Sequence, residues 1–141
     1  MNNTLLFTYG TLRQGESNSY ILRNNSSYLG TVKTVDKFIM VTTDEGSFPY
    51  LILPEYWPEK EEKAIQITGD IYSITQEGIS ECDRLEGHPL WYIRTCIQCI
   101  SKTLKINTVQ AYILTRESWE NMSKDNLIII NGDWKYIKQK N

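Results

Sequence analysis

Short runs of β-branched and aromatic residues, each ending at glycine, proline, asparagine or a polar cluster, make up most of this sequence. Such runs are typical of β-strands, and they do not alternate with helices as a parallel βαβ arrangement would require. We therefore expect an α+β domain in which a mixed or antiparallel sheet rolls into a small barrel with flanking α-helices. The expected strands cover residues 4–9, 28–43 (two strands), 64–74, 92–101 and 106–114, and the last two form a hairpin. A further apolar run at 48–53 is broken by Pro49 and closed by Pro54.

The clearest helix covers Gln76–Glu86. Gly87 is placed to end it in the left-handed conformation, and Pro89 prevents its continuation. The other expected features are a short helix from Ser17 or Asn18 to Leu22, a surface loop at 54–63, a bend or bulge at Gly69, one or two helical turns at 118–122 and a turn at 131–133.

The composition narrows the class of protein. A length of 141 residues suits one domain, expected to cover residues 1–141. The net charge of −2 argues against a nucleic-acid partner. No apolar run approaches the roughly 20 residues that cross a bilayer, the first residues do not form a signal peptide, and three cysteines suit a reducing compartment. We therefore expect a cytoplasmic protein with no membrane partner, and a monomer is the simplest expectation.

A glycine-containing loop, Tyr9-Gly10-Thr11-Leu12-Arg13-Gln14-Gly15-Glu16-Ser17, follows the first expected strand. Its spacing nearly matches a P-loop, but Glu16 occupies the lysine position and would repel phosphates. Two interpretations stay open. The loop is a connecting turn in which the glycines supply positive φ, or backbone amides near Gly10 hold a small anion or oxyanion.

Glu86 is an acid on the inward face of the expected helix. It falls within the arc of the apolar residues, whereas the other acids lie toward the flanks or the opposite side. Burial and the helix dipole both raise a carboxyl pKa at this position, which suits proton transfer near neutral pH. The alternative is a terminal glutamate that reaches water or pairs with Arg84 or Arg94. The apolar arc comprises Ile79, Cys82 and Leu85, and the other acids are Glu77, Glu81 and Asp83.

A metal site is the less favoured interpretation of the cysteines. Cys96 and Cys99 have C-x-x-C spacing, but they lie in an expected strand, where residues three apart face opposite sides of the sheet. We expect buried, apolar cysteines and no metal or cofactor. His88 is the only histidine; it follows Gly87 in a turn, which favours a structural role.

Together, these segments resemble the gamma-glutamylcyclotransferase-like family, in particular its gamma-glutamylamine cyclotransferase and avirulence-induced branch. The order and rough spacing agree from Leu6 to about Tyr112, and the Tyr-Gly-Thr-Leu loop combined with a Leu-Glu-Gly helix end is fairly specific. The matching segments are Phe7-Thr8-Tyr9-Gly10-Thr11-Leu12-Arg13-Gln14-Gly15 followed by Asn18, Phe48-Pro49-Tyr50-Leu51, Gly69-Asp70-Ile71-Tyr72, Leu85-Glu86-Gly87 followed by Tyr92 and Arg94, and Ala111-Tyr112.

The resemblance implies a β-barrel with an open cavity at one end and an enzyme that converts a γ-glutamyl amine or peptide into 5-oxoproline and a free amine. It implies that Glu86 is the catalytic acid/base and that the loop binds the glutamyl group through Tyr9, Gly10, Thr11 and Leu12. Tyr92 and Tyr112 are further expected cavity residues. The rival hypotheses are a non-catalytic module of the same fold that binds small ligands, and a protein without a small ligand. The released amine, and whether the loop holds the α-carboxylate or the oxyanion, stay open.

Overall fold

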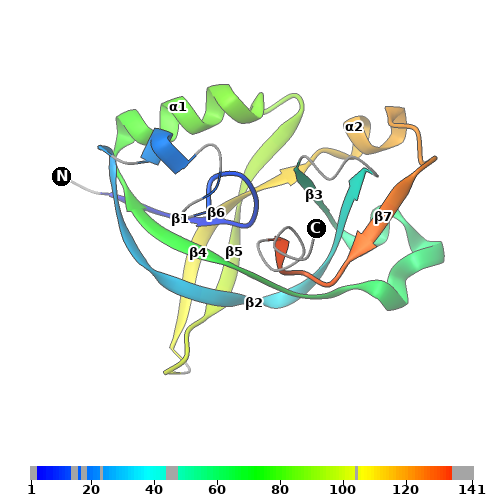
Figure 1. Ribbon diagram of the computed structural model, residues 1–141, viewed down its shortest axis with the longest axis horizontal. Helices are drawn as coiled ribbons and strands as arrows, with labels where there is room; N and C mark the ends of the chain where they lie inside the picture. Colours follow the sequence, from blue (N-terminus) through cyan, green and yellow to red (C-terminus); the bar gives the residue numbers. More distant parts are fainter. Residues whose placement is uncertain are drawn as a thin grey trace.

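Five strands of the computed structural model close into a mixed barrel, as the sequence predicted (Figure 1). Around the barrel they follow the order β2-β4-β1-β6-β5, and a short antiparallel pairing of β5 with β2 completes the ring. Only the pairing of β1 with β6 is parallel among these contacts. The barrel strands are β1 (Thr4–Thr8), β2 (Ser26–Thr43), β4 (Ile65–Ile74), β5 (Tyr92–Ile100) and β6 (Ile106–Leu114). The structure describes residues 3–13, 16, 19–22, 24–43, 48–103 and 105–134.

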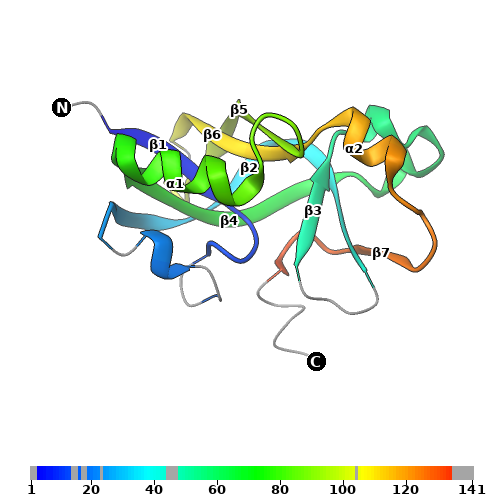
Figure 2. The ribbon, with the colours of Figure 1, turned by 90° about the horizontal axis from the view of Figure 1, so that it is seen from above.

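The expectation of two strands within residues 28–43 is wrong, because β2 is one strand of 18 residues. Its register against β4 shifts twice, between Tyr28 and Gly30 and between Lys33 and Lys37. Such irregularities bend a strand, so β2 can leave the barrel and continue beside β3 (Pro49–Ile52) and β7 (Leu127–Ile130). Figure 2 shows this extension on the side of the barrel away from the N-terminus.

Helix α1 (Gln76–Glu86) has the predicted bounds and the predicted end. The Thr75 hydroxyl accepts a hydrogen bond from the Gly78 amide at 3.2 Å, which caps the first turn. Gly87 has a φ of 66° and its amide donates to the Arg84 carbonyl, which closes the helix in the left-handed conformation.

The smaller helices differ from the sequence expectation. Residues 54–56 and 58–63 form two 3₁₀-helices instead of a loop without regular structure, because a proline begins each of them. The helical turns expected at 118–122 start two residues earlier, where Thr115 provides the cap. Ser17 and Asn18 lie outside the described residues. The elements are η1 (Ser19–Leu22), η2 (Pro54–Tyr56), η3 (Pro58–Lys63) and α2 (Arg116–Asn121).

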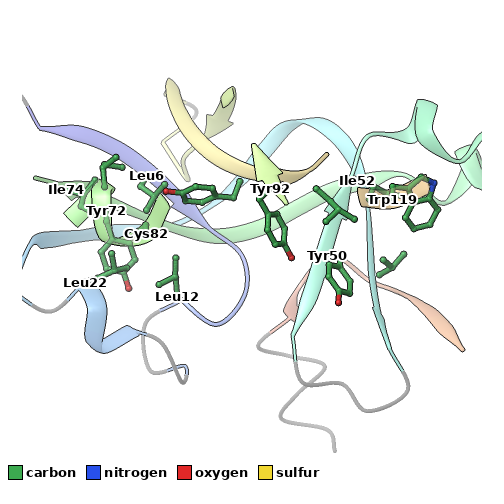
Figure 3. Packing of buried hydrophobic residues seen from close by; sticks show 14 of the residues in the cluster. Leu6, Leu12, Leu22, Tyr50, Ile52, Tyr72, Ile74, Cys82, Tyr92 and Trp119 are labelled. Atoms are coloured by element: carbon green, nitrogen blue, oxygen red, sulfur yellow. The ribbon is translucent and has the colours of Figure 1, made fainter. Parts of the chain in front are cut away.

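The buried apolar side chains form two clusters on opposite faces of the barrel strands. All five barrel strands contribute to one cluster, for example Phe7, Ile71 and Ala111, so this cluster fills the barrel. The other cluster lies between the barrel wall and the helices, and includes Cys82 of α1 and Trp119 of α2 (Figure 3). This second cluster positions the end of α1 against the barrel.

Gly69 permits a close approach of strands and does not mark a bulge. It pairs with Val32 inside the continuous strand β4. A Cβ atom there would lie 2.4 Å from the Thr8 carbonyl oxygen and 2.5 Å from the Phe7 ring. The predicted turn at 131–133 is confirmed by a positive φ of 86° at Gly132. Among the described residues, no helix combines the length and apolar character needed to cross a membrane.

Candidate active site

A cavity of about 250 Å³ opens where the end of α1 meets the loop after β1 and the first residues of β3 and β5. Every site residue predicted from the sequence lines it. These residues are Tyr9, Gly10, Thr11, Leu12, Glu86, Tyr92 and Tyr112. The further lining residues, which the sequence did not indicate as a group, are Phe7, Thr8, Phe48, Pro49, Leu85 and Trp91.

Glu86 contributes a carboxyl group to this cavity from the last residue of α1. Neither Arg84 nor Arg94 pairs with it, and within the described part of the chain its carboxyl group makes no hydrogen bond or ion pair. Burial raises the pKa of the Glu86 carboxyl from 4.5 to about 7. A group with this pKa exchanges protons readily near neutral pH.

Arg94 instead pairs with Asp83, a partner that the helical arc did not suggest. Its guanidinium donates to both Asp83 oxygens, at 2.8 and 3.1 Å, and also to the Gln110 side chain. The Tyr112 hydroxyl donates to Asp83 at 2.6 Å. Burial raises the pKa of Asp83, but the hydrogen bonds from Arg94 and Tyr112 and the charge of Arg94 outweigh it and lower that pKa overall. Asp83 is therefore an ionised structural partner.

Tyrosines form the inner wall of the cavity. The Tyr9 hydroxyl donates to the Tyr112 carbonyl at 2.6 Å, which ties the loop after β1 to β6. The Tyr92 ring stacks on Tyr50 with centroids 6.4 Å apart (Figure 3). Burial, followed by the charge of Glu86, raises the pKa of Tyr92 well above its usual value. These phenols therefore stay protonated and can act as hydrogen-bond donors.

The loop after β1 turns at Gly10, whose carbonyl accepts from the Arg13 amide at 2.9 Å. The connecting-turn interpretation required a positive φ at Gly10, and this requirement is wrong, because the positive-φ glycines of the described chain are Gly30, Gly87 and Gly132. The reason for glycine is contact with another chain segment. A Cβ atom at Gly10 would lie 2.9 Å from Cδ and 3.0 Å from Cγ of Pro49. Gly15 lies outside the described residues.

Arg13 anchors this loop from inside the protein. Its side chain is 5% exposed and pairs with Asp133 at 2.8 Å and Asp70 at 3.4 Å. Thr31 also donates to Asp70 at 3.0 Å. The loop is thereby fixed to β4 and to the turn after β7. This network depends on residues far apart in the sequence, and the sequence pattern gave no signal for it.

The next feature is the burial and the contacts of the cysteines and of His88. Cys99 is buried as expected, but Cys96 is exposed, because residues three apart on β5 face opposite sides. The His88 ring accepts a hydrogen bond from the Arg94 amide at 3.0 Å through Nδ1. Over the described ranges, no group of three His, Cys, Asp or Glu side chains could hold a metal ion.

Known proteins share both the sequence pattern and the fold. A gamma-glutamylaminecyclotransferase B of Danio rerio is 30% identical over 124 residues, which cover 82% of this chain and 61% of that protein. A putative gamma-glutamylcyclotransferase of Vibrio cholerae is 28% identical over 130 residues, covering 92% of this chain and 94% of that protein. The crystal structure of a mouse AIG2-like protein has the same fold, with a TM-score of 0.71 at 23% identity over 87% of this chain and 86% of that one.

The chain spans about three fifths of the zebrafish relative's length but nearly the whole Vibrio relative. The family model described as gamma-glutamyl cyclotransferase, AIG2-like, matches residues 6–136. That range includes all five barrel strands except the first two residues of β1, and every predicted site residue. The chain belongs to the gamma-glutamyl cyclotransferase, AIG2-like family.

Proposed function

We propose that this protein is a cyclotransferase that converts a γ-glutamyl amine or peptide into 5-oxoproline and the free amine, with Glu86 as the acid/base. The observation that carries the proposal is the Glu86 carboxyl group, which lines the cavity without an ion-pair partner among the described residues and has a pKa raised by burial to about 7. The names of the zebrafish and Vibrio relatives support the same class of activity.

The reaction needs few protein groups because the substrate carries its own nucleophile. Glu86 takes a proton from the α-ammonium group, and the freed amine attacks the γ-carbonyl carbon. The new N–C bond closes a five-membered ring, and the bond to the departing amine breaks as its nitrogen receives a proton. Overall the ring nitrogen loses two protons and the departing nitrogen gains two, so no water is consumed. Holding the folded conformer supplies several kcal/mol of the acceleration.

The other lining groups suit substrate binding. The cavity of about 250 Å³ lies just below the roughly 300–1,000 Å³ of pockets for drug-sized ligands, which fits an amino-acid-sized group. Backbone amides at Gly10–Leu12 are our candidates for holding the α-carboxylate or the oxyanion. The neutral Tyr92 hydroxyl makes no hydrogen bond within the described part of the chain and is a candidate donor to the substrate.

The test is direct. The protein is incubated with a panel of γ-glutamyl amines and peptides, and 5-oxoproline and free amine are quantified by chromatography. We expect the two products in equal amounts, with Glu86→Gln as the inactive control. Saturable binding of γ-glutamyl ligands without product would instead support a non-catalytic binding module, and neither binding nor product would exclude both.

A further inference from the structure

The chain makes a compact turn directly after Glu86. The Gly87 carbonyl accepts from the Leu90 amide and from the Trp91 amide, both at 2.9 Å. A Cβ atom on Gly87 would lie 3.1 Å from Cβ of Trp91, so the end of the turn packs against its start. Trp91 and Glu86 line the same cavity. The position of this turn therefore decides how closely Trp91 covers the Glu86 side.

The start of α2 holds the turn from the other side (Figure 2). The Thr115 amide donates to the Trp91 carbonyl at 3.1 Å. The Thr115 hydroxyl donates to the Leu90 carbonyl at 3.1 Å, and the Ser118 hydroxyl lies 3.3 Å from the same oxygen. Two successive carbonyls of the turn are thus bound by the cap of one short helix.

The two hydroxyls of this cap act together. The Thr115 hydroxyl accepts from the Ser118 amide at 3.1 Å and lies 2.8 Å from the Ser118 hydroxyl. Each hydroxyl has one proton to donate. Either Thr115 donates to the Leu90 carbonyl, or Thr115 donates to Ser118 and Ser118 donates to that carbonyl. Both arrangements give the Leu90 carbonyl a donor.

Helix α2 is itself fixed to the framework. The Trp119 indole donates to the Tyr56 carbonyl at 3.1 Å, and its ring lies 5.1 Å from that of Trp57. Trp119 is buried in the cluster between the barrel wall and the helices. The described lining of the cavity contains neither Thr115 nor a residue of α2. Any effect of this cap on the cavity therefore passes through the turn after Glu86.

We propose that Thr115 and Ser118 are positioning residues for Glu86: their hydroxyls hold the Leu90–Trp91 end of the turn where it keeps water from the Glu86 carboxyl group and fixes that group at the cavity. The consequence for catalysis rests on the proposed function, whereas the shielding of Glu86 does not.

The groups that surround Glu86 make its protonation a readout of this shielding. Burial first, with the charge of Glu86 among the further causes, raises the pKa of three neighbours, which are therefore neutral near pH 7. They are Tyr9 in the loop after β1, Cys82 on α1 and Tyr92 on β5. The charged groups nearby, Asp83 and Arg94, balance one another. Burial raises the pKa of Glu86 to about 7, so access of water would lower it.

The experiment titrates Glu86 by NMR in protein whose glutamate side chains carry ¹³C, with Glu86→Gln to assign the signal. The double variant Thr115→Val/Ser118→Ala removes both hydroxyls and retains the Thr115 amide. We expect the pKa of Glu86 to fall by at least about half a unit. We also expect kcat to fall at least about tenfold, because the carboxyl group is no longer held in place.

Two further variants separate positioning from stability. Thr75→Val is the matched control, because the Thr75 hydroxyl caps the opposite end of α1 through the Gly78 amide at 3.2 Å. It should lower the midpoint of urea denaturation, as the loss of a helix cap does, and leave the pKa of Glu86 unchanged. Thr115→Ser keeps a hydroxyl in place and should keep the wild-type pKa of Glu86.

The outcomes decide the inference without reference to turnover. An unchanged pKa of Glu86 in a folded double variant, checked by circular dichroism, would overturn it. An equal fall in Thr75→Val would also overturn it, since stability alone would then explain the shift. Should the double variant not fold, Ser118→Ala alone decides: a lowered pKa supports the inference and an unchanged one overturns it. No 5-oxoproline from any γ-glutamyl compound would overturn the proposed function and leave the titration valid.

Discussion

The Asp83 carboxylate binds the Arg94 guanidinium through two hydrogen bonds, 2.8 Å from Nε to Oδ1 and 3.1 Å from Nη2 to Oδ2. Glu86 lies one helical turn further along α1 and takes no part in this pairing. Arg94, a cation that could hold Glu86 ionised, is already paired with Asp83, and the pairing also balances the charge of Asp83. Burial is then the dominant influence on the pKa of Glu86.

Removing Arg94 and removing Asp83 should shift the pKa of Glu86 in opposite directions. Arg94→Met leaves an unbalanced carboxylate near Glu86 and should raise its pKa. Asp83→Asn leaves an unbalanced guanidinium and should lower it. In both cases we expect shifts of up to about one unit. The measurement is the acidic limb of kcat/KM against pH, which moves to higher pH for Arg94→Met and to lower pH for Asp83→Asn.

The double variant Asp83→Asn/Arg94→Met is the control, because it removes both charges together. Its acidic limb should return close to that of the wild type, even if overall activity falls through altered packing of Tyr112. Shifts of both single variants in the same direction would contradict an electrostatic role for the pair.

The Gly10 loop makes a second prediction. Because a Cβ atom at Gly10 would lie 2.9 Å from the Pro49 ring, Gly10→Ala must displace either the loop or the start of β3. Both segments line the cavity, so we expect kcat/KM to fall about tenfold or more while the fold is retained. Pro49→Ala in the same protein removes the obstructing ring atoms and should restore part of the loss. No restoration would show that the contact with Pro49 does not limit substrate use.

The fold was predictable from the sequence where the apolar residues of a single strand or helix follow the period of that element. The alternation in residues 92–101 and 106–114 predicts the β5–β6 hairpin, and the arc of Ile79, Cys82 and Leu85 predicts α1 with its bounds. The continuity of β2 could not be read in this way, because its two register shifts arise from pairing with β4. A strand that changes partners along its length shows no single period.

Part of the candidate site was predictable from the sequence, because an acid on an apolar helix face is unusual. Glu86 was identified from its position on an apolar helix face, and Tyr9–Leu12 from the resemblance to a family. The partner of Asp83 was not predictable, since the helical arc gives no information on which strand residue lies opposite. The apolar lining residues Phe48, Leu85 and Trp91 similarly come from three segments that meet only in the folded chain.

The buried network around Arg13 makes a third prediction, on stability. Arg13→Met would leave Asp70, whose side chain is 3% exposed, without the arginine charge. Breaking a buried pair in this way typically costs about 3–5 kcal/mol. Arg116→Met is the matched control, because Arg116 pairs with Glu55 at 3.7 Å where both side chains are well exposed, and it should cost less than about 1 kcal/mol. Urea denaturation measures both; equal costs would contradict the anchoring role of Arg13.

The fourth prediction is that Glu86→Gln abolishes catalysis and not binding. Glutamine has nearly the same volume but cannot take the α-ammonium proton. We therefore expect kcat to fall about 10²–10⁴-fold, with little change in the Kd of a non-cyclisable glutamyl analogue. Wild-type kcat/KM should rise with pH through an apparent pKa near 7, shaped also by the substrate amine, because the ionised carboxylate is the form that accepts the proton. Full activity in Glu86→Gln would assign the proton transfer to another group.

The same variant makes a prediction on stability. The folded state raises the pKa of Glu86 from 4.5 to about 7, so it favours the neutral carboxyl group. The contribution of Glu86 to the free energy of unfolding is therefore highest below pH 4.5. It falls by on the order of 2–3 kcal/mol as pH rises through about 7. Glutamine never ionises, so Glu86→Gln should gain stability over the wild type above pH 7 and lose that advantage toward pH 4.5. Glu81→Gln, an exposed acid on the same helix, is the control. A Glu86→Gln advantage that is constant across this range in thermal unfolding would mean that burial does not disfavour the charge of Glu86.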